Sequence, residues 1–252
     1  MFPSTRYDFY VGQNHNKGFI IIANKAALDG SKPWVWFAPT FYNNFPCKLH
    51  DWMFNQLLAN GFAICGVDVG ESFGSPHGRK IYSDFYEYVI SKYRLNPQAC
   101  FIAQSRGGLM AYNWAAENPK KIKCIAGIYT VCDLNSYPSL NAASLYTCPP
   151  AYNMTHSQLC SNLENHNPID RLTPLADNHI PILHIHGDVD TVVPLEKNSK
   201  LLVQRYKDLG GHAELIVVNG KGHEEVPEFF QAQLMVDFLI SQGTIFPSNM
   251  HD

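Results

Sequence analysis

Length, composition and charge exclude several classes of protein. The chain has 252 residues, a formal net charge of −3 and 46% hydrophobic residues. A chain of this length can bury a large core within one domain without disulfide bonds. The small negative charge provides no basic field, so we expect no nucleic-acid partner. No apolar run approaches the roughly 18 residues of a membrane span, so we also expect no membrane partner. Nothing in the composition selects an oligomeric state.

The N-terminal residues and the cysteines bear on the cellular location. Residues 1–10 lack the basic start and following apolar stretch of a signal peptide. The seven cysteines are odd in number, so at least one thiol has no partner within the chain. Cys148 and Cys160 flank a short segment and could form a disulfide bond. The sequence slightly favours a cytoplasmic protein over a mature secreted form.

Strand and helix patterns alternate along most of the chain. Residues 6–11 and 19–24 predict two antiparallel strands. From about residue 34 the alternation predicts a mostly parallel sheet of about eight strands with helices on both faces. The predicted buried strands span residues 34–38, 63–69, 100–104, 124–129, 182–186 and 214–218. The predicted helices span residues 51–58, 81–93, 107–116, 158–165, 195–209 and 229–240.

One long segment interrupts this alternation. Residues 131–180 are rich in Pro, Asn, Ser and Tyr and separate two predicted strands. Loops of this length in compact domains are usually functional or disordered. We therefore predict a single domain over residues 1–252, with a small cap-like insertion at about residues 131–180.

Ser105 lies in the segment Ala103-Gln104-Ser105-Arg106-Gly107, between a predicted strand and a predicted helix. A serine hydroxyl is a weak nucleophile at neutral pH, so a hydrolase exposes it on a tight turn beside a base. The usual pattern is G-x-S-x-G, because the strained turn brings the strand and helix backbones close together. Ala103 replaces the first glycine and is also small. This context predicts that Ser105 is a nucleophile.

An acid and a histidine follow the next strands along the chain. Asp190 comes after the predicted strand 182–186, where its carboxylate can orient a base. Asp188 is the rival acid, because either aspartate could instead stabilise the turn. His223 follows the predicted strand 214–218 on a glycine-containing loop. We predict that Asp190 and His223 complete a triad with Ser105.

The order nucleophile, acid, histidine is that of the α/β-hydrolase triad. The chain resembles the α/β-hydrolase superfamily, and within it the prolyl-oligopeptidase-like and dienelactone-hydrolase-like serine esterases. The resemblance is sharpest at His186-Gly187-x-x-Asp190-x-x-Val193-Pro194 and at Gly222-His223-Glu224. It covers nearly the whole chain and implies an α/β-hydrolase fold. It also implies acyl-enzyme chemistry without a cofactor, in which His223 takes the Ser105 proton while Asp190 holds the ring.

An oxyanion hole needs two backbone N–H donors. One donor is expected from Arg106, the residue after the nucleophile. The second is expected from the loop after strand 34–38, where relatives often have His-Gly and this chain has Pro39-Thr40-Phe41. Proline has no N–H. We therefore assign the second donor to Phe41, with Thr40 as the alternative.

The substrate pocket is less defined by the sequence. The Arg106 side chain could anchor an acidic substrate group, or it could form an ion pair with Glu71 or Asp68. We favour the ion pair. Our candidate substrate-binding residues are Tyr42, Trp52, Glu71 and Tyr152. His184 and His186 lie within a strand pattern and lack a convincing third ligand, so we expect them to be structural and expect no metal.

The leading functional hypothesis is a serine hydrolase that cleaves carboxylic esters through an acyl-enzyme. Its substrate would be a small-molecule or oligosaccharide ester, and the high aromatic content together with the family resemblance favours an acylated carbohydrate. The alternative is a serine peptidase of the prolyl-oligopeptidase type, although we expect no β-propeller domain within 252 residues. A catalytically silent binding protein with this fold is the third hypothesis.

Overall fold

The computed structural model describes residues 2–24, 32–38, 46–140 and 148–244, and these contain an eight-stranded sheet in the order β1-β2-β4-β3-β5-β6-β7-β8. The strands are β1 (Ser4–Val11), β2 (Asn16–Ala23), β3 (Trp34–Ala38), β4 (Ala63–Val67), β5 (Ala99–Gln104), β6 (Ile122–Ile128), β7 (Ile182–Gly187) and β8 (Ala213–Val218). β1 and β2 pair antiparallel, β2 is antiparallel to β4, and the remaining neighbours are parallel. The mostly parallel eight-stranded sheet is confirmed.

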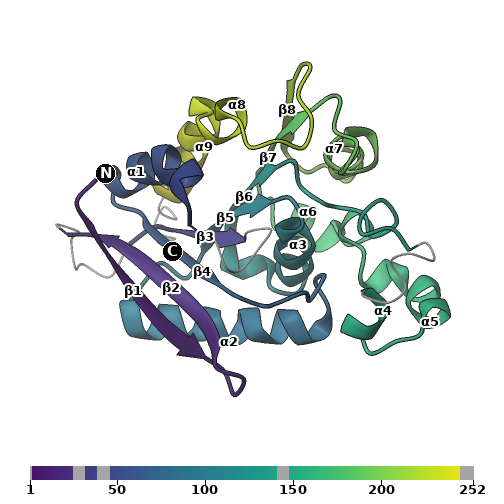
Figure 1. Cartoon of the computed structure of the whole chain (residues 1–252), viewed down its shortest axis with the longest axis horizontal. Helices are drawn as coiled ribbons and strands as arrows, with labels where there is room; N and C mark the ends of the chain where they lie inside the picture. The colour runs from purple at the N-terminus through teal and green to yellow at the C-terminus, as the bar shows by residue number, and fades with distance from the viewer. Residues whose placement is uncertain (1, 25–31, 39–45, 141–147, 245–252) are drawn as a thin grey trace, which may run out of the picture.

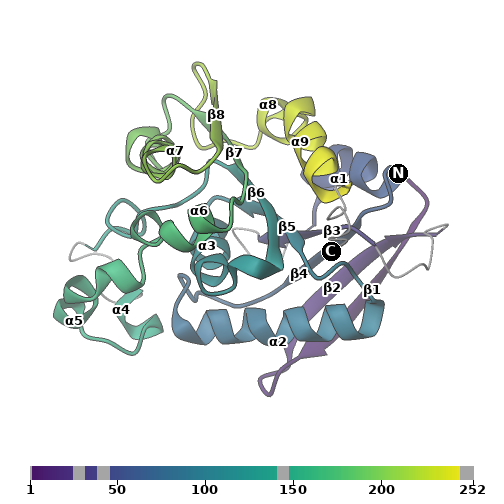
Figure 2. The same cartoon turned by 180° about the vertical axis from the view of Figure 1, so that it is seen from behind.

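Helices cover both faces of this sheet (Figure 1). The helices are α1 (Asp51–Ala59), α2 (Pro76–Tyr93), α3 (Gly107–Glu117), α4 (Cys148–Ala151), α5 (His156–Ser161), α6 (Thr173–Asp177), α7 (Ser199–Asp208), α8 (Pro227–Phe230) and α9 (Gln233–Thr244). The one-turn 3₁₀ helices are Lys48–His50, Pro119–Lys121, Leu163–Asn165, Pro168–Asp170 and Leu195–Lys197. α1, α8 and α9 lie on one face, whereas α2, α3 and α7 lie on the other, as the view from behind also shows (Figure 2). The fold is that of an α/β-hydrolase.

Alternate side chains of the central strands contribute to the two hydrophobic cores, one on each face of the sheet. In β3, Trp34 and Trp36 pack into the core beneath α2 and α3, whereas Val35 and Phe37 pack into the core beneath α1 and α9. All four side chains are fully buried. Successive strand residues point to opposite faces, so a strand covered on both sides must be apolar throughout.

Three helix predictions need correction. The predicted helix 195–209 is interrupted at Asn198, whose side chain accepts from the Cys132 N–H at 2.9 Å and donates to the Pro194 carbonyl at 2.9 Å. These bonds hold the backbone of Asn198 outside helical geometry. The predicted helix 229–240 is divided into α8 and α9, with Gln231 outside helical geometry between them. The predicted helix 158–165 is α5 followed by a separate 3₁₀ turn.

The described residues between β6 and β7 pack beside α3 and the loop before α2 rather than standing apart from the core. The Tyr152 hydroxyl donates to the Phe73 carbonyl at 2.6 Å, and the Asn113 side chain on α3 donates to the His166 carbonyl at 2.7 Å. α4 and α5 lie at the side of the molecule beyond α3 (Figure 1). Whether this segment acts as a cap stays a prediction.

Candidate functional site

Three side chains from separate loops meet at the carboxyl edge of the parallel sheet. Ser105 follows β5, Asp190 follows β7 and His223 follows β8. Parallel strands present their carboxyl ends at one edge, so residues far apart in sequence come together there. The distance from Ser105 Oγ to His223 Nε2 is 2.9 Å, and that from His223 Nδ1 to Asp190 Oδ2 is 2.8 Å.

A strained turn places Ser105 between β5 and α3. Its φ is +49°, in the left-handed region that non-glycine residues seldom adopt. Two backbone hydrogen bonds hold it: the Ser105 N–H donates to the Ile128 carbonyl, and the Val131 N–H donates to the Ser105 carbonyl, both at 2.9 Å. A Cβ on Gly108 would lie 2.2 Å from Thr130 Cγ2 and 2.3 Å from the Val131 carbonyl oxygen. The sequence therefore needs a glycine where α3 approaches the loop after β6.

The two aspartates of the β7 loop have different partners. Asp188 Oδ1 accepts from the Gly220 N–H at 2.6 Å and so fixes the turn after β8. Asp190 Oδ1 accepts from the N–H groups of Val192 and Val193 at 2.9 and 2.8 Å, while its Oδ2 faces His223. The carboxylate that meets the imidazole therefore belongs to Asp190.

The environment of Asp190 stabilises its ionised form. Burial alone would raise the pKa of Asp190, but hydrogen bonds from His186, His223 and the Val193 N–H hold it below its ordinary value. His186 Nε2 lies 3.3 Å from Asp190 Oδ2. The carboxylate is thus ionised at neutral pH, as a group that stabilises an imidazolium must be.

A buried hydrogen-bond chain sets the tautomer of His186. Its Nε2 lies 2.8 Å from the Val193 carbonyl, which can only accept, so Nε2 carries the proton. Nδ1 then accepts from Ser199 Oγ at 2.8 Å, and Ser199 in turn accepts from His184 Nδ1 at 2.8 Å. The chain ends at the Tyr112 hydroxyl, 2.7 Å from His184 Nε2. Both histidines are fully buried and hydrogen-bonded within the structure, as we expected.

A cavity of about 220 Å³ opens beside Ser105. Its lining residues are Gln104, Ser105, Tyr129, Tyr137, Val192, His223 and Glu225. Five of these were absent from the sequence prediction. Gln104 directly precedes the predicted nucleophile, and Glu225 follows the predicted histidine by two residues; this proximity in sequence is the signal that could have identified them.

The predicted pocket residues have diverse positions. Arg106 forms an ion pair with Glu71, which confirms the expected pairing, and the Arg106 side chain is buried. Trp52 packs against the core beneath α1, and Tyr152 is buried, so neither is among the described residues that line the cavity. The expected residues Thr40, Phe41 and Tyr42 lie outside the described residues.

Cys148 and Cys160 do not form the disulfide bond that their spacing allowed. Both are free thiols, Cys148 buried and Cys160 exposed.

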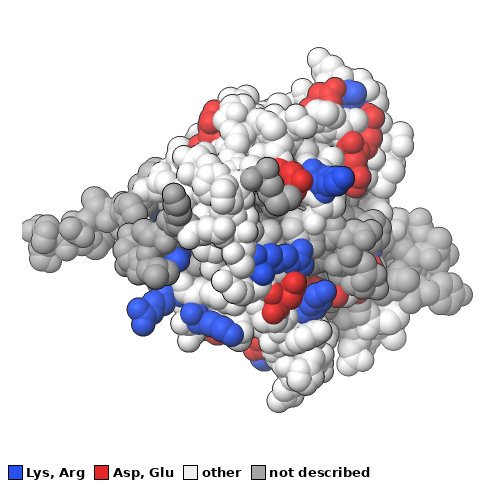
Figure 3. Space-filling view, turned by 60° about the vertical axis from the view of Figure 1, so that its left-hand side comes forward, with Lys and Arg blue, Asp and Glu red and all other residues white. Residues whose placement is uncertain are grey.

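On the face in Figure 3, Lys and Arg are interspersed with Asp and Glu on a largely uncharged surface. Over the described parts of the chain, none of the helices has the length and apolar character needed to cross a membrane.

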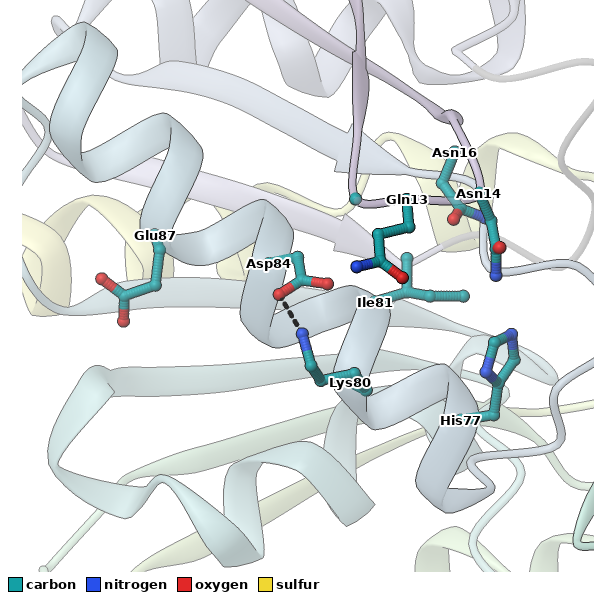
Figure 4. Close-up of a pocket in the computed structure, with 9 residues that line it drawn as sticks. Gln13, Asn14, Asn16, His77, Lys80, Ile81, Asp84 and Glu87 are labelled. Atoms are coloured by element: carbon teal, nitrogen blue, oxygen red, sulfur yellow. Dashed lines mark hydrogen bonds and ion pairs between the residues drawn. The ribbon is translucent and has the colours of Figure 1, made fainter.

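A second cavity of about 650 Å³ lies between the β1–β2 turn and α2. Asn14 on the turn and Asn16 at the start of β2 face the α2 residues His77, Lys80 and Asp84 across it (Figure 4). The Lys80 and Asp84 side chains form an ion pair one helical turn apart. None of the predicted site residues that the structure describes lines this cavity.

Comparisons with known proteins identify a family and several solved structures that share the fold. A family model described as the prolyl oligopeptidase family matches residues 77–240. Among solved structures, a truncated carbohydrate esterase from gut microbiota aligns with a TM-score of 0.75 and 19% identity, over 97% of this chain and 98% of that one. An S-formylglutathione hydrolase from Agrobacterium tumefaciens aligns with a TM-score of 0.69 and 13% identity, over 96% and 97% of the two chains.

A longer protein also matches. The acylaminoacyl peptidase from Pyrococcus horikoshii aligns with a TM-score of 0.72 and 16% identity, over 98% of this chain. This chain spans only 43% of that peptidase. No curated protein sequence matches the chain.

Proposed function

The chain belongs to the prolyl oligopeptidase family of serine hydrolases, and we propose that it cleaves carboxylic esters with Ser105, His223 and Asp190 as its catalytic triad. The observation that carries the proposal is the 2.9 Å contact between Ser105 Oγ and His223 Nε2, because a base within hydrogen-bond reach is what a serine nucleophile requires.

The proposed reaction has two halves. His223 Nε2 takes the Ser105 proton while Oγ attacks the ester carbonyl, and Asp190 stabilises the imidazolium through the Nδ1–H. His223 then protonates the departing alcohol, which leaves an acyl group on Oγ. A water molecule, deprotonated by the same imidazole, attacks this acyl-enzyme. The carboxylic acid leaves and Ser105 regains its proton.

The oxyanion hole is part of the same proposal. The Arg106 N–H lies at the start of α3, directly after Ser105, and the second donor would be the N–H of Phe41 or Thr40. Each such donor is worth roughly 3 kcal/mol of transition-state stabilisation. In this scheme the Arg106 side chain does not bind an acidic group of the substrate, because it forms an ion pair with Glu71.

An ester of an acylated carbohydrate is the substrate class that we favour. The carbohydrate esterase aligns over 98% of its own length, whereas the acylaminoacyl peptidase aligns over 43%. A cavity of about 220 Å³ suits a short acyl group or one sugar unit better than a peptide. In this scheme residues 131–180 form a cap that contributes Tyr137 to the cavity.

The test is a panel of acetyl, feruloyl and glucuronoyl esters together with aminoacyl amides. A fluorophosphonate that labels Ser105 serves as the control for an active nucleophile. We expect ester cleavage and little amide cleavage. Amide cleavage at rates that rival the esters would support the peptidase instead. A protein that is neither labelled nor active would be the catalytically silent alternative.

A further inference from the structure

Tyr129 lies beside the reacting groups at the end of β6. Its φ is +34°, an unusual value for a bulky residue, and its N–H donates to the Ile185 carbonyl at 2.9 Å. The Tyr129 ring lies 4.3 Å from the ring of His223 and packs edge-to-face on Phe229 at 5.2 Å. These contacts fix the Tyr129 side chain, which lines the same cavity as Ser105.

A chain of buried groups determines how the Tyr129 hydroxyl is oriented. The Cys47 N–H donates to Nδ1 of His50 at 3.4 Å, so Nδ1 is unprotonated and Nε2 carries the ring proton. Burial lowers the pKa of His50, which keeps the ring neutral. Nε2 then donates to Gln104 Oε1 at 2.9 Å. The Gln104 amide is thereby fixed, and its Nε2 donates to the Tyr129 hydroxyl oxygen at 3.1 Å.

The hydroxyl proton of Tyr129 is consequently directed away from Gln104. Within the described residues, no acceptor takes this proton, although the side chain is buried. Burial raises the pKa of Tyr129, so the group remains a donor at every ordinary assay pH. A buried donor without an acceptor is destabilising, and a ligand oxygen in the cavity would satisfy it.

We propose that Tyr129 is a substrate-binding residue whose hydroxyl donates to an oxygen of a carbohydrate alcohol, with His50 and Gln104 as its positioning residues. This inference rests on the proposed ester hydrolysis at Ser105 and specifies the substrate class. The Glu225 carboxylate lines the same cavity as an acceptor, and Tyr137 adds a second aromatic ring. A donor, an acceptor and an aromatic surface match a hydroxyl-bearing sugar ring.

The experiment compares two acetate esters that share an acyl group and a six-membered ring. One is a mono-acetylated methyl glucoside, and the other is cyclohexyl acetate, which lacks the sugar oxygens. Tyr129→Phe should lower kcat/KM for the sugar ester about tenfold and leave that for cyclohexyl acetate within twofold. Gln104→Glu should give the same selective loss, because the carboxylate would accept the Tyr129 proton.

Tyr206→Phe is the matched control. Its buried hydroxyl donates to the Ile180 carbonyl at 2.7 Å. Tyr206 has no role in substrate binding in this scheme. We expect its kcat/KM for both esters to equal that of the unmodified protein. Equal losses on both esters in Tyr129→Phe, or no loss on either, would overturn the inference. So would an unmodified protein that cleaves cyclohexyl acetate and not the sugar ester, while ester hydrolysis itself would stand. Failure to cleave either ester would overturn both proposals.

Discussion

Asp190 Oδ2 lies 2.8 Å from Nδ1 of His223, and the turn after β8 that carries this histidine is fixed by Asp188 Oδ1, which accepts from the Gly220 N–H. Two aspartates two residues apart thus have separate tasks: one contacts the imidazole, and the other holds its loop. An aspartate that forms a turn and one that contacts a histidine look alike in the sequence.

Exchanging each aspartate for asparagine should distinguish these tasks. In Asp190→Asn, kcat for a p-nitrophenyl ester should fall by about 10³–10⁴-fold, because the neutral amide neither fixes the reactive tautomer nor stabilises the imidazolium. In Asp188→Asn, an oxygen still accepts from Gly220, so kcat should fall less than about tenfold. Steady-state kinetics of both variants measure this. A larger loss in Asp188→Asn would transfer the acid role.

His186 should act through Asp190 rather than on the substrate. His186→Leu removes the Nε2–H that faces Asp190 and leaves the Ser199 hydroxyl without its acceptor. The free energy of unfolding should fall by about 1–3 kcal/mol, and kcat/KM should fall with it. His186→Gln retains an N–H at the position of Nε2 and should recover most of the kcat/KM. Urea unfolding and ester kinetics would measure both; equal behaviour of the two variants would refute this role.

Burial of His184 should make stability depend on pH. Burial, with a smaller contribution from His186, lowers the pKa of His184 to about 3, whereas an exposed histidine titrates near 6.5. Between these values the unfolded chain binds the extra proton. His184 therefore stabilises the fold fully above about pH 6.5, and this stability is lost as the pH falls, by at most about 1.4 kcal/mol per pH unit.

His184→Asn should reduce this dependence. Asparagine can still donate to Ser199 but does not titrate, so the difference in unfolding free energy between pH 7 and pH 4.5 should shrink. His166, whose pKa is lowered to about 4 chiefly by burial, should leave a residual dependence. Chemical unfolding at the two pH values tests this. An unchanged difference in His184→Asn would show that His184 does not control it.

Gly108 should tolerate no side chain. An alanine Cβ there would lie 2.3 Å from the Val131 carbonyl oxygen, so either the backbone or α3 must move. Gly108→Ala should lower the free energy of unfolding by about 1–3 kcal/mol. Gly222→Ala is the control, since its nearest neighbour would be 3.6 Å away, and it should change stability by less than about 0.5 kcal/mol. Similar losses in both variants would contradict the packing argument.

Much of the fold could be predicted because buried parallel strands are apolar on both faces. The pattern at residues 34–38 predicts β3 with its observed bounds. The break at Asn198 could not be predicted, because its cause is a hydrogen bond to Cys132, 66 residues away. Local propensity contains no information about such a tertiary bond.

The candidate site, like the fold, could be predicted only in part. Chain order and strand ends predict Ser105, Asp190 and His223, and these three side chains do meet. The residues that line the cavity could not be predicted. Tyr129, for example, reaches the cavity because β6 pairs with β5 and β7. From the sequence alone, an aromatic residue at a strand end that lines a cavity cannot be distinguished from one that is buried in the core.

The most direct test of the central claim is the rate of p-nitrophenyl acetate hydrolysis by Ser105→Ala, measured with circular dichroism to verify the fold. Serine hydrolysis through Ser105 predicts that kcat falls by about 10⁶-fold, to the level left by binding and the oxyanion hole, and that fluorophosphonate labelling disappears. A folded Ser105→Ala protein that retains the original turnover would contradict the assignment of the nucleophile.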